Sequence, residues 1–287
     1  MQRRAWLLLL PTLLTLGVFG AAFAMFLSVS LATAVPGTAV VTGPATLANY
    51  RAALSSPVAQ GAALNTLRLA GLMTLITAVL GYPLAYVLAR SPHRWVRRAV
   101  LFGLVLTLLS GGVTRAYAWL VLLGNRGLVN QALVALGLPT FKLVHNEIGV
   151  VIGVVHFLLP FFVLTLLAAL RSIPESLEDA ARNLGASRAR AFLHIVLPLS
   201  IPGLMAAASL SFAGALSAFL FPELLGGGRV RMAANLIYER VITDYNLPRV
   251  AAMAALFLVL ALCALGALAL VQRYFARRFP SAAMNAT

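Results

Sequence analysis

Residues 148–170 read IGVVIGVVHFLLPFFVLTLLAAL, a run of 23 residues without an acidic, lysine or arginine side chain. The hydrocarbon core of a bilayer is about 30 Å thick, and a helix of about 20 apolar residues crosses it. We therefore expect this stretch to span a membrane. Further uncharged runs cover residues 7–31, 69–89, 191–222 and 250–272, and a shorter one covers 99–114.

The composition of the whole chain agrees with this interpretation. The 287 residues are 61% hydrophobic and 10% charged, and the mean hydropathy is +0.95. This composition excludes a soluble globular enzyme. The sequence predicts an all-α, polytopic membrane protein that forms a single transmembrane domain over residues 1–287. Its six membrane helices are expected at residues 6–31, 61–89, 99–122, 147–170, 195–221 and 248–272.

The charge distribution predicts the orientation in the membrane. The net charge is +15, and with both termini in the cytoplasm 13 basic residues fall on the cytoplasmic side and 7 on the outer side. Basic residues are enriched in cytoplasmic loops of membrane proteins, which favours this topology. Topology and contact with membrane lipid therefore account for the basic composition, and no nucleic-acid partner is expected.

The sequence lacks the common motifs that bind nucleotides or metals. A P-loop needs a Gly-Lys-Ser or Gly-Lys-Thr sequence, and the single lysine, Lys142, follows Phe141. The histidines lack the spacing of a zinc-binding helix, and Cys263 is the single cysteine. We expect no catalytic residue, no metal site and no cofactor in this chain.

The charged stretch 171–194 predicts two short helices joined by a turn. Ser172 and Glu175 have the spacing of a capping box, so a helix is expected to begin there and to end at Leu184. Gly185 suits the left-handed residue that follows a helix. Ser187 can cap a second short helix, so the loop should form a compact unit outside the bilayer.

This stretch resembles the EAA loop of permease subunits from binding-protein-dependent ABC importers, and we therefore name residues 171–194 the coupling loop. The resemblance rests on seven positions within 20 residues, namely Asp179, Ala180, Ala181, Gly185, Ile195, Leu197 and Pro198. Asp179 replaces the usual glutamate, although Glu178 precedes it, so the exact contact of this acid can differ. The resemblance implies a type I importer fold. It also implies that these seven residues and Glu178 couple the membrane domain to an ATP-hydrolysing subunit.

A second resemblance, to spermidine/putrescine-type permeases, rests on residues 115–119 (RAYAW), 123–130 (LGNRGLVN), 81–83 (GYP) and 222–228 (PELLGGG). It implies that a polyamine is imported across a bacterial inner membrane. The implied partners are a second permease subunit in a heterodimer, two ATPase copies that bind ATP and magnesium, and an extracytoplasmic solute-binding protein. Gly226, Gly227 and Gly228 are then the candidate contact loop for that binding protein.

Polar residues in or near the spans are candidates for the substrate pathway, because such residues are costly within a bilayer. The alternative is that they form hydrogen bonds between helices or belong to ordinary loops. Arg68 and His156 are expected to contact neighbouring helices. The candidates for the pathway are Arg115, Tyr117, Trp119, Glu223, Asp244 and Tyr245.

Two other functions stay open at this point. Arg68 and Arg115 would place positive charge in the pathway, which suits an anionic solute such as an aminophosphonate or an opine. An ion-coupled secondary transporter is the other alternative, but it would need acidic residues within the spans. The expected spans carry no central aspartate or glutamate, so this alternative ranks below an ABC permease.

Overall fold

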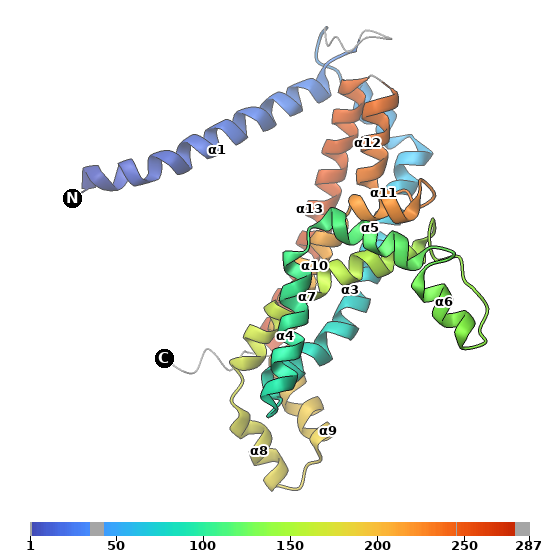
Figure 1. Ribbon diagram of the computed structural model, residues 1–287. Coiled ribbons are helices and arrows are strands. Elements are labelled where there is room, and N and C mark those ends of the chain that lie inside the picture. The colour runs from blue at the N-terminus through green and yellow to red at the C-terminus, as the bar shows by residue number, and fades with distance from the viewer. Residues whose placement is uncertain (1, 35–42, 245, 279–287) are drawn as a thin grey trace. The chain divides into compact units, whose positions relative to one another are not determined.

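The computed structural model describes residues 2–34, 43–244 and 246–278, and the regular elements in these ranges are helices (Figure 1). The chain divides into two compact units. The first comprises Met1–Ala63 and Ala233–Leu260, and the second comprises Leu64–Met232 and Ala261–Thr287. Helices α3 (Pro57–Arg90) and α13 (Leu247–Arg278) contribute to both units.

The first unit has a small apolar core of its own. Besides parts of α3 and α13 it contains α1 (Gln2–Leu31), α2 (Ala48–Leu54) and α12 (Ala233–Thr243). Leu236 and Met253 are buried there among alanines of α2 and α3. The side chain of Asn49 donates hydrogen bonds to the carbonyl oxygens of Ser30 and Ala32, which ties α2 to the end of α1.

The second unit is built around α7 (Glu147–Arg171), which packs along α10 (Leu197–Leu216). Over its most apolar 18 residues, α7 is 56% buried, the largest share among the candidate spans. A side chain at Gly203 of α10 would collide with Ala169 of α7, so the two helices approach closely. The remaining helices of this unit are α4 (Arg94–Leu109), α5 (Gly112–Leu123), α6 (Leu128–Ala135), α8 (Glu175–Asn183), α9 (Arg188–Ala191), η1 (Phe192–Val196) and α11 (Leu220–Gly226).

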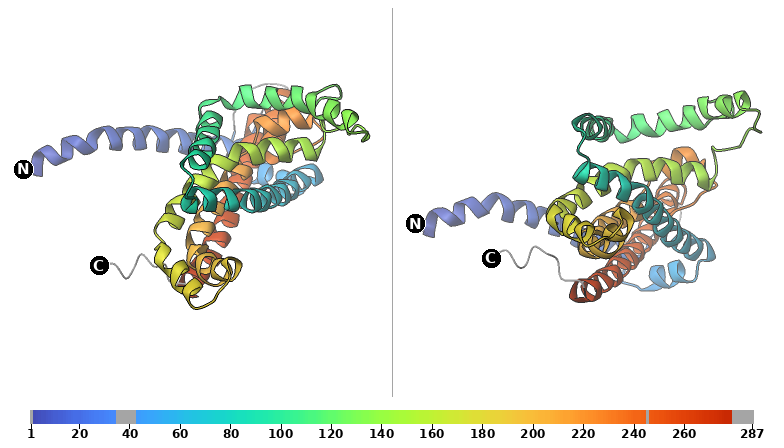
Figure 2. Two further views of the ribbon diagram at one scale, coloured as in Figure 1. Left: turned by 60° about the horizontal axis from the view of Figure 1, so that its bottom comes forward. Right: turned by 90° about the horizontal axis from the view of Figure 1, so that it is seen from below.

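Five helices are long and apolar enough to cross a membrane, and a bent pair provides a sixth candidate span. That pair replaces the single helix expected at 99–122, because the chain bends by 107° between α4 and α5 (Figure 2). Ser110 and Gly111 cause the break, since their ψ angles of 126° and 149° are extended. The adjacent Gly111 and Gly112 carry a conformational cost within a helix, which favours the break.

The helix expected at 195–221 is also divided, because α10 ends at Leu216 and α11 begins at Leu220. Besides α8 and α9, three helices of the described residues lie outside the expected spans. The short helix α2 lies in the segment between the first two spans, α6 lies in the glycine-containing segment between α5 and α7, and α12 lies between α11 and α13 in the chain.

Candidate functional site

The coupling loop folds as two helices with a glycine turn between them. Gly185 has a φ of +88°, and its amide donates to the carbonyl oxygen of Arg182, while the amide of Ala186 donates to that of Ala181. These two bonds form a Schellman motif, which ends α8 where the sequence predicts. The Ser187 hydroxyl accepts a hydrogen bond from the Arg190 amide and caps α9, as predicted.

The start of α8 differs from the expected capping box. Ser172 has helical angles, φ −75° and ψ −12°, and its hydroxyl donates to the carbonyl oxygen of Ala169. An N-cap residue needs extended angles, so Ser172 closes α7 instead of opening α8. Pro174, with a ψ of 133°, is the residue that precedes α8.

Helix α8 has two faces of opposite character. Glu175, Glu178 and Arg182 share one face by helical spacing, and all three line a cavity against α3 and α9. Leu177, Ala180 and Leu184 share the opposite face and are exposed, Leu184 by 90%. An ordinary surface helix buries its apolar face, so this reversed arrangement leaves an apolar stripe available to a partner.

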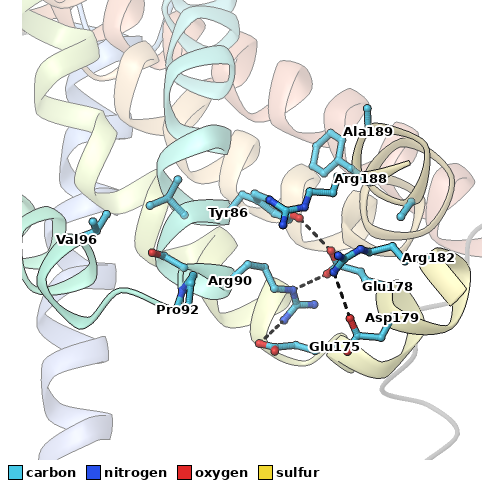
Figure 3. Close-up of a pocket in the computed structure, with 14 residues that line it drawn as sticks. Tyr86, Arg90, Pro92, Val96, Glu175, Glu178, Asp179, Arg182, Arg188 and Ala189 are labelled. Atoms are coloured by element: carbon cyan, nitrogen blue, oxygen red, sulfur yellow. Dashed lines mark hydrogen bonds and ion pairs between the residues drawn. The ribbon is translucent and has the colours of Figure 1, made fainter. Parts of the chain in front are cut away.

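Arg90, at the end of α3, holds α8 through its polar face (Figure 3). Its Nε lies 2.6 Å from Oε1 of Glu178 and its Nη1 lies 3.5 Å from Oε1 of Glu175. The guanidinium also donates to the carbonyl oxygen of Ile173 at 2.7 Å. Tyr86, one turn earlier on α3, donates to the other carboxylate oxygen of Glu178 at 3.0 Å.

The two acids of the motif region therefore have different surroundings. The side chain of Glu178 is 15% exposed and that of its partner Arg90 is 11% exposed. The side chain of Asp179 is 67% exposed and faces Arg182 at 3.7 Å within α8. Asp179 is thus open to a partner protein, whereas Glu178 is committed to α3.

The other residues of the EAA-like motif extend from α8 into α10. Ala180 is exposed and Ala181 is half-buried on α8. Ile195 lies in η1, a single π-helical turn, and Leu197 and Pro198 begin α10. Helical structure is therefore continuous from α9 through η1 into α10.

The cavity between α8, α9 and the end of α3 measures about 780 Å³. Figure 3 shows charged side chains of both signs around it. Its basic residues are Arg90, Arg182 and Arg188, and its acidic residues are Glu175, Glu178 and Asp179. This balance favours neither a purely anionic nor a purely cationic ligand.

Three pathway candidates lie on α5. Arg115 is 7% exposed, and its guanidinium carbon lies over the Phe157 ring, 4.8 Å from the ring centroid. Its Nε and Nη1 atoms have no hydrogen-bond partner within the described part of the chain. Trp119 donates from Nε1 to Nδ1 of His156 at 3.2 Å, which confirms that His156 contacts a neighbouring helix. Tyr117 is 52% exposed and belongs to the other face of α5.

Trp119 and His156 border an apolar groove of about 590 Å³ between α3 and α7. Glu147, the first residue of α7, also borders it. The sequence predicts Glu147 only as the first residue of the helix at 147–170, and its position at this groove was not predicted. Arg68 of α3 forms an ion pair with Glu147, so Arg68 contacts a neighbouring helix, as expected.

The remaining pathway candidates, Glu223 and Asp244, fall in separate units. Glu223 is an exposed residue of α11 in the second unit. Asp244 belongs to the first unit, where both carboxylate oxygens accept hydrogen bonds from Nη1 of Arg240 at 3.1 Å. Tyr245 lies outside the described residues.

The three consecutive glycines form a tight turn. Gly226 is buried and ends α11, while Gly227 and Gly228 have φ angles of +53° and +74°. The Leu225 carbonyl accepts a hydrogen bond from the His145 amide at 2.6 Å, which fixes the turn to the segment before α7. Within residues 2–34, 43–244 and 246–278, no cluster of histidine, cysteine and acidic side chains could hold a metal ion.

Solved structures show which fold this arrangement resembles. The bacterial ABC transporter involved in the import of the acidic polysaccharide alginate has a chain that matches with a TM-score of 0.80 at 21% identity. The match covers 97% of this chain and 98% of that one. The MetNI methionine ABC transporter matches with a TM-score of 0.58 at 17% identity, over 75% of this chain and 94% of that one.

Sequence comparison shows the family. The spermidine/putrescine transport system permease protein PotB of Haemophilus influenzae is 33% identical, over 71% of this chain and 72% of that protein. The molybdenum transport system permease protein ModB of Mycobacterium bovis is 32% identical, over 76% of this chain and 81% of that protein. Residues 81–279 match the family of binding-protein-dependent transport system inner membrane components. The chain belongs to this family and is a multi-pass inner-membrane permease subunit of an ABC importer.

Proposed function

We propose that this permease imports a polyamine such as spermidine or putrescine. The observation that carries the proposal is the 33% identity to PotB proteins of Haemophilus influenzae and Escherichia coli over 71% of this chain. The residues 115–119 and 123–130, which resemble spermidine/putrescine-type permeases, include the buried Arg115 and the groove residue Trp119.

The coupling loop and both termini lie in the cytoplasm in this proposal. The excess of 13 basic residues on that side over 7 on the other supports the orientation. ATP is cytoplasmic, so an ATPase that drives the importer must meet the permease on this side. The coupling loop is the charged segment that connects α7 to α10 there.

The outward face of α8 is the proposed docking surface for the ATPase. Leu177, Ala180 and Leu184 would be buried on docking, and the exposed Asp179, which also borders the cavity, would lie at the edge of this surface. Apolar side chains that lie in a row on an exposed helix are typical of a helix that inserts into a groove of a partner. ATP and magnesium would be bound by that partner and not by this chain.

The complete importer in this proposal has several further subunits. A second permease forms a heterodimer with this chain, two ATPase copies dock below, and an extracytoplasmic binding protein delivers the substrate. The related alginate transporter has been solved with a substrate-bound periplasmic protein. The turn at Gly227 and Gly228 is exposed and is the proposed contact with the binding protein.

The groove beside α7 offers suitable chemistry for a polyamine. Trp119 presents an aromatic ring, and Glu147 presents a carboxylate at the same groove. Ammonium groups bind to aromatic faces and to carboxylates. A polyamine could therefore replace the Arg68 guanidinium at Glu147 as it passes.

An anionic solute, such as an aminophosphonate or opine, is the second candidate, and Arg115 is the observation that favours it. The Arg115 guanidinium is buried, and two of its nitrogens have no hydrogen-bond partner among the described residues. An oxyanion would accept hydrogen bonds from these two nitrogens. The molybdenum permease ModB is nearly as similar as PotB.

Uptake in cells that lack other polyamine importers distinguishes the two. The permease, expressed with its partner subunits, should accumulate labelled spermidine, and unlabelled putrescine should compete while molybdate should not. Glu147→Gln should reduce spermidine uptake, since the carboxylate that attracts the ammonium group is lost. Uptake of an oxyanion, lost in Arg115→Gln and unaffected in Glu147→Gln, would contradict the polyamine assignment.

A further inference from the structure

We propose that α3 transmits the movement of the coupling loop to the groove within the membrane, through a clamp formed by Tyr82, Tyr86 and Arg90. This inference rests on the proposed docking of α8 on an ATPase. The coupling loop is joined directly to α7 and α10. The proposal assigns a role in coupling to a third helix, α3, which is distant from the loop in sequence.

The three clamp residues share one face of α3. They are spaced four residues apart, so their side chains form a row about 12 Å long. Together they contact two parts of the segment that follows α7, namely α8 and α10. Arg90 pairs with Glu178 of α8, Tyr86 donates to the same carboxylate, and the hydroxyl of Tyr82 lies 2.7 Å from that of Ser200 on α10.

A single aromatic ring joins the two tyrosines of the clamp. The ring of Phe192, the first residue of η1, meets Tyr82 and Tyr86 edge-on, with centroid distances of 5.6 Å and 5.2 Å. Perpendicular ring pairs of this kind are favourable. The π-helical turn η1 is therefore held against α3 between the contacts to α8 and α10.

The ion pair at the end of the clamp is shielded from water. The Arg90 and Glu178 side chains are 11% and 15% exposed, compared with 49% and 67% for Arg182 and Asp179 on the same loop. Removing one partner of a shielded pair leaves an uncompensated charge, so the pair resists separation. The coupling loop and the end of α3 should therefore move together.

The same helix also borders the membrane groove. Leu72, Ile76 and Leu80 of α3 line it together with Trp119 and His156. From Leu72 to Arg90 the helix rises about 27 Å. A displacement of α8 by the ATPase would thus reach the groove through one continuous helix.

The first test separates coupling from docking. Glu178→Gln should retain co-purification of the ATPase, because the residue faces α3. Its substrate uptake per ATP hydrolysed should fall by about fivefold or more, the lower end of typical coupling between sites. The charge exchange Arg90→Glu with Glu178→Arg should recover part of that loss. Arg97→Gln, which removes an exposed arginine of α4, is the control.

The outcomes are distinct. Unchanged uptake per ATP in Glu178→Gln would overturn the clamp. Loss of the ATPase from that variant would also overturn it, because Glu178 would then belong to the docking surface. If the ATPase fails to co-purify with the wild-type permease, the proposed function fails instead.

The second test needs no ATPase. Spin labels at Ser91, after α3, and Asn183, at the end of α8, report the distance between the two elements in the purified permease. The Cys263→Ala background removes the native thiol. We expect a narrow distance distribution that broadens in Glu178→Gln. Equal widths in the two proteins would overturn the clamp.

Discussion

At the scale of single residues, two adjacent acids of the coupling loop differ in their exposure. Glu178 and Asp179 are neighbours in the recognised motif, yet one faces α3 and the other faces solvent. Arg90 and Glu178 are 88 residues apart. A single sequence contains no signal for such a pair, because the pairing depends on how α3 and α8 pack.

Leu184 provides a test of the docking surface. Leu184→Ser should reduce co-purification of the ATPase by about tenfold or more, since burying a leucine is worth about 1.5–3 kcal/mol. Leu136→Ser is the matched control, because Leu136 follows α6 as Leu184 follows α8 and is 75% exposed. Equal effects of the two substitutions would contradict the proposed surface.

Arg68 tests the substrate's charge. Its side chain is 60% exposed and that of Glu147 is 49% exposed, so their ion pair contributes at most about 1 kcal/mol to stability. Arg68→Gln should therefore leave thermal unfolding nearly unchanged, and spermidine uptake should stay within a few-fold of the wild type. A transported anion whose uptake disappears in this variant, with assembly intact, would favour the anionic alternative.

At the scale of elements, hydropathy predicts the long helices, and glycine accounts for one break, the one between α4 and α5. The spans expected at 61–89 and 147–170 correspond to α3 and α7 within a few residues. The division between α4 and α5 has a local signal, Ser110 followed by two glycines, that the uncharged run concealed. Helix α6 was missed because glycine and proline in the surrounding segment suggested only turns.

The turn at Gly185 tests the coupling loop as an element. Gly185→Val should cost about 1–3 kcal/mol locally, because a β-branched residue is strained at a φ of +88°. The helices α8 and α9 would then be misaligned, and both uptake and ATPase co-purification should be lost. Gly137→Val is the control, since Gly137 closes α6 with the same pair of backbone hydrogen bonds at a φ of +72°. ATPase binding that survives Gly185→Val would argue against a rigid docking unit.

At the scale of the whole molecule, family membership follows from patterns that a single sequence carries. Five apolar spans with one bent pair, the EAA-like loop and the match over residues 81–279 agree with one another. No single stretch of sequence identifies the substrate. Trp119 and Glu147 suit a cation, Arg115 suits an anion, and these side chains come from separate helices.

The orientation is a testable property of the whole chain. In the Cys263→Ala background, single cysteines at the exposed positions Arg126 and Arg229 should react with an impermeant thiol reagent in intact cells. A cysteine at Ala189, on α9, should react only after the membrane is opened. Labelling at position 189 in intact cells would contradict the proposed topology and would place the coupling loop outside the cytoplasm.

Transport by the reconstituted importer tests the central claim most directly. Proteoliposomes that contain this permease, its partner permease and the ATPase are supplied with binding protein and labelled spermidine. Accumulation should require both ATP and the binding protein, and it should be lost with Gly185→Val. Accumulation that continues without ATP and follows an imposed ion gradient would contradict the account.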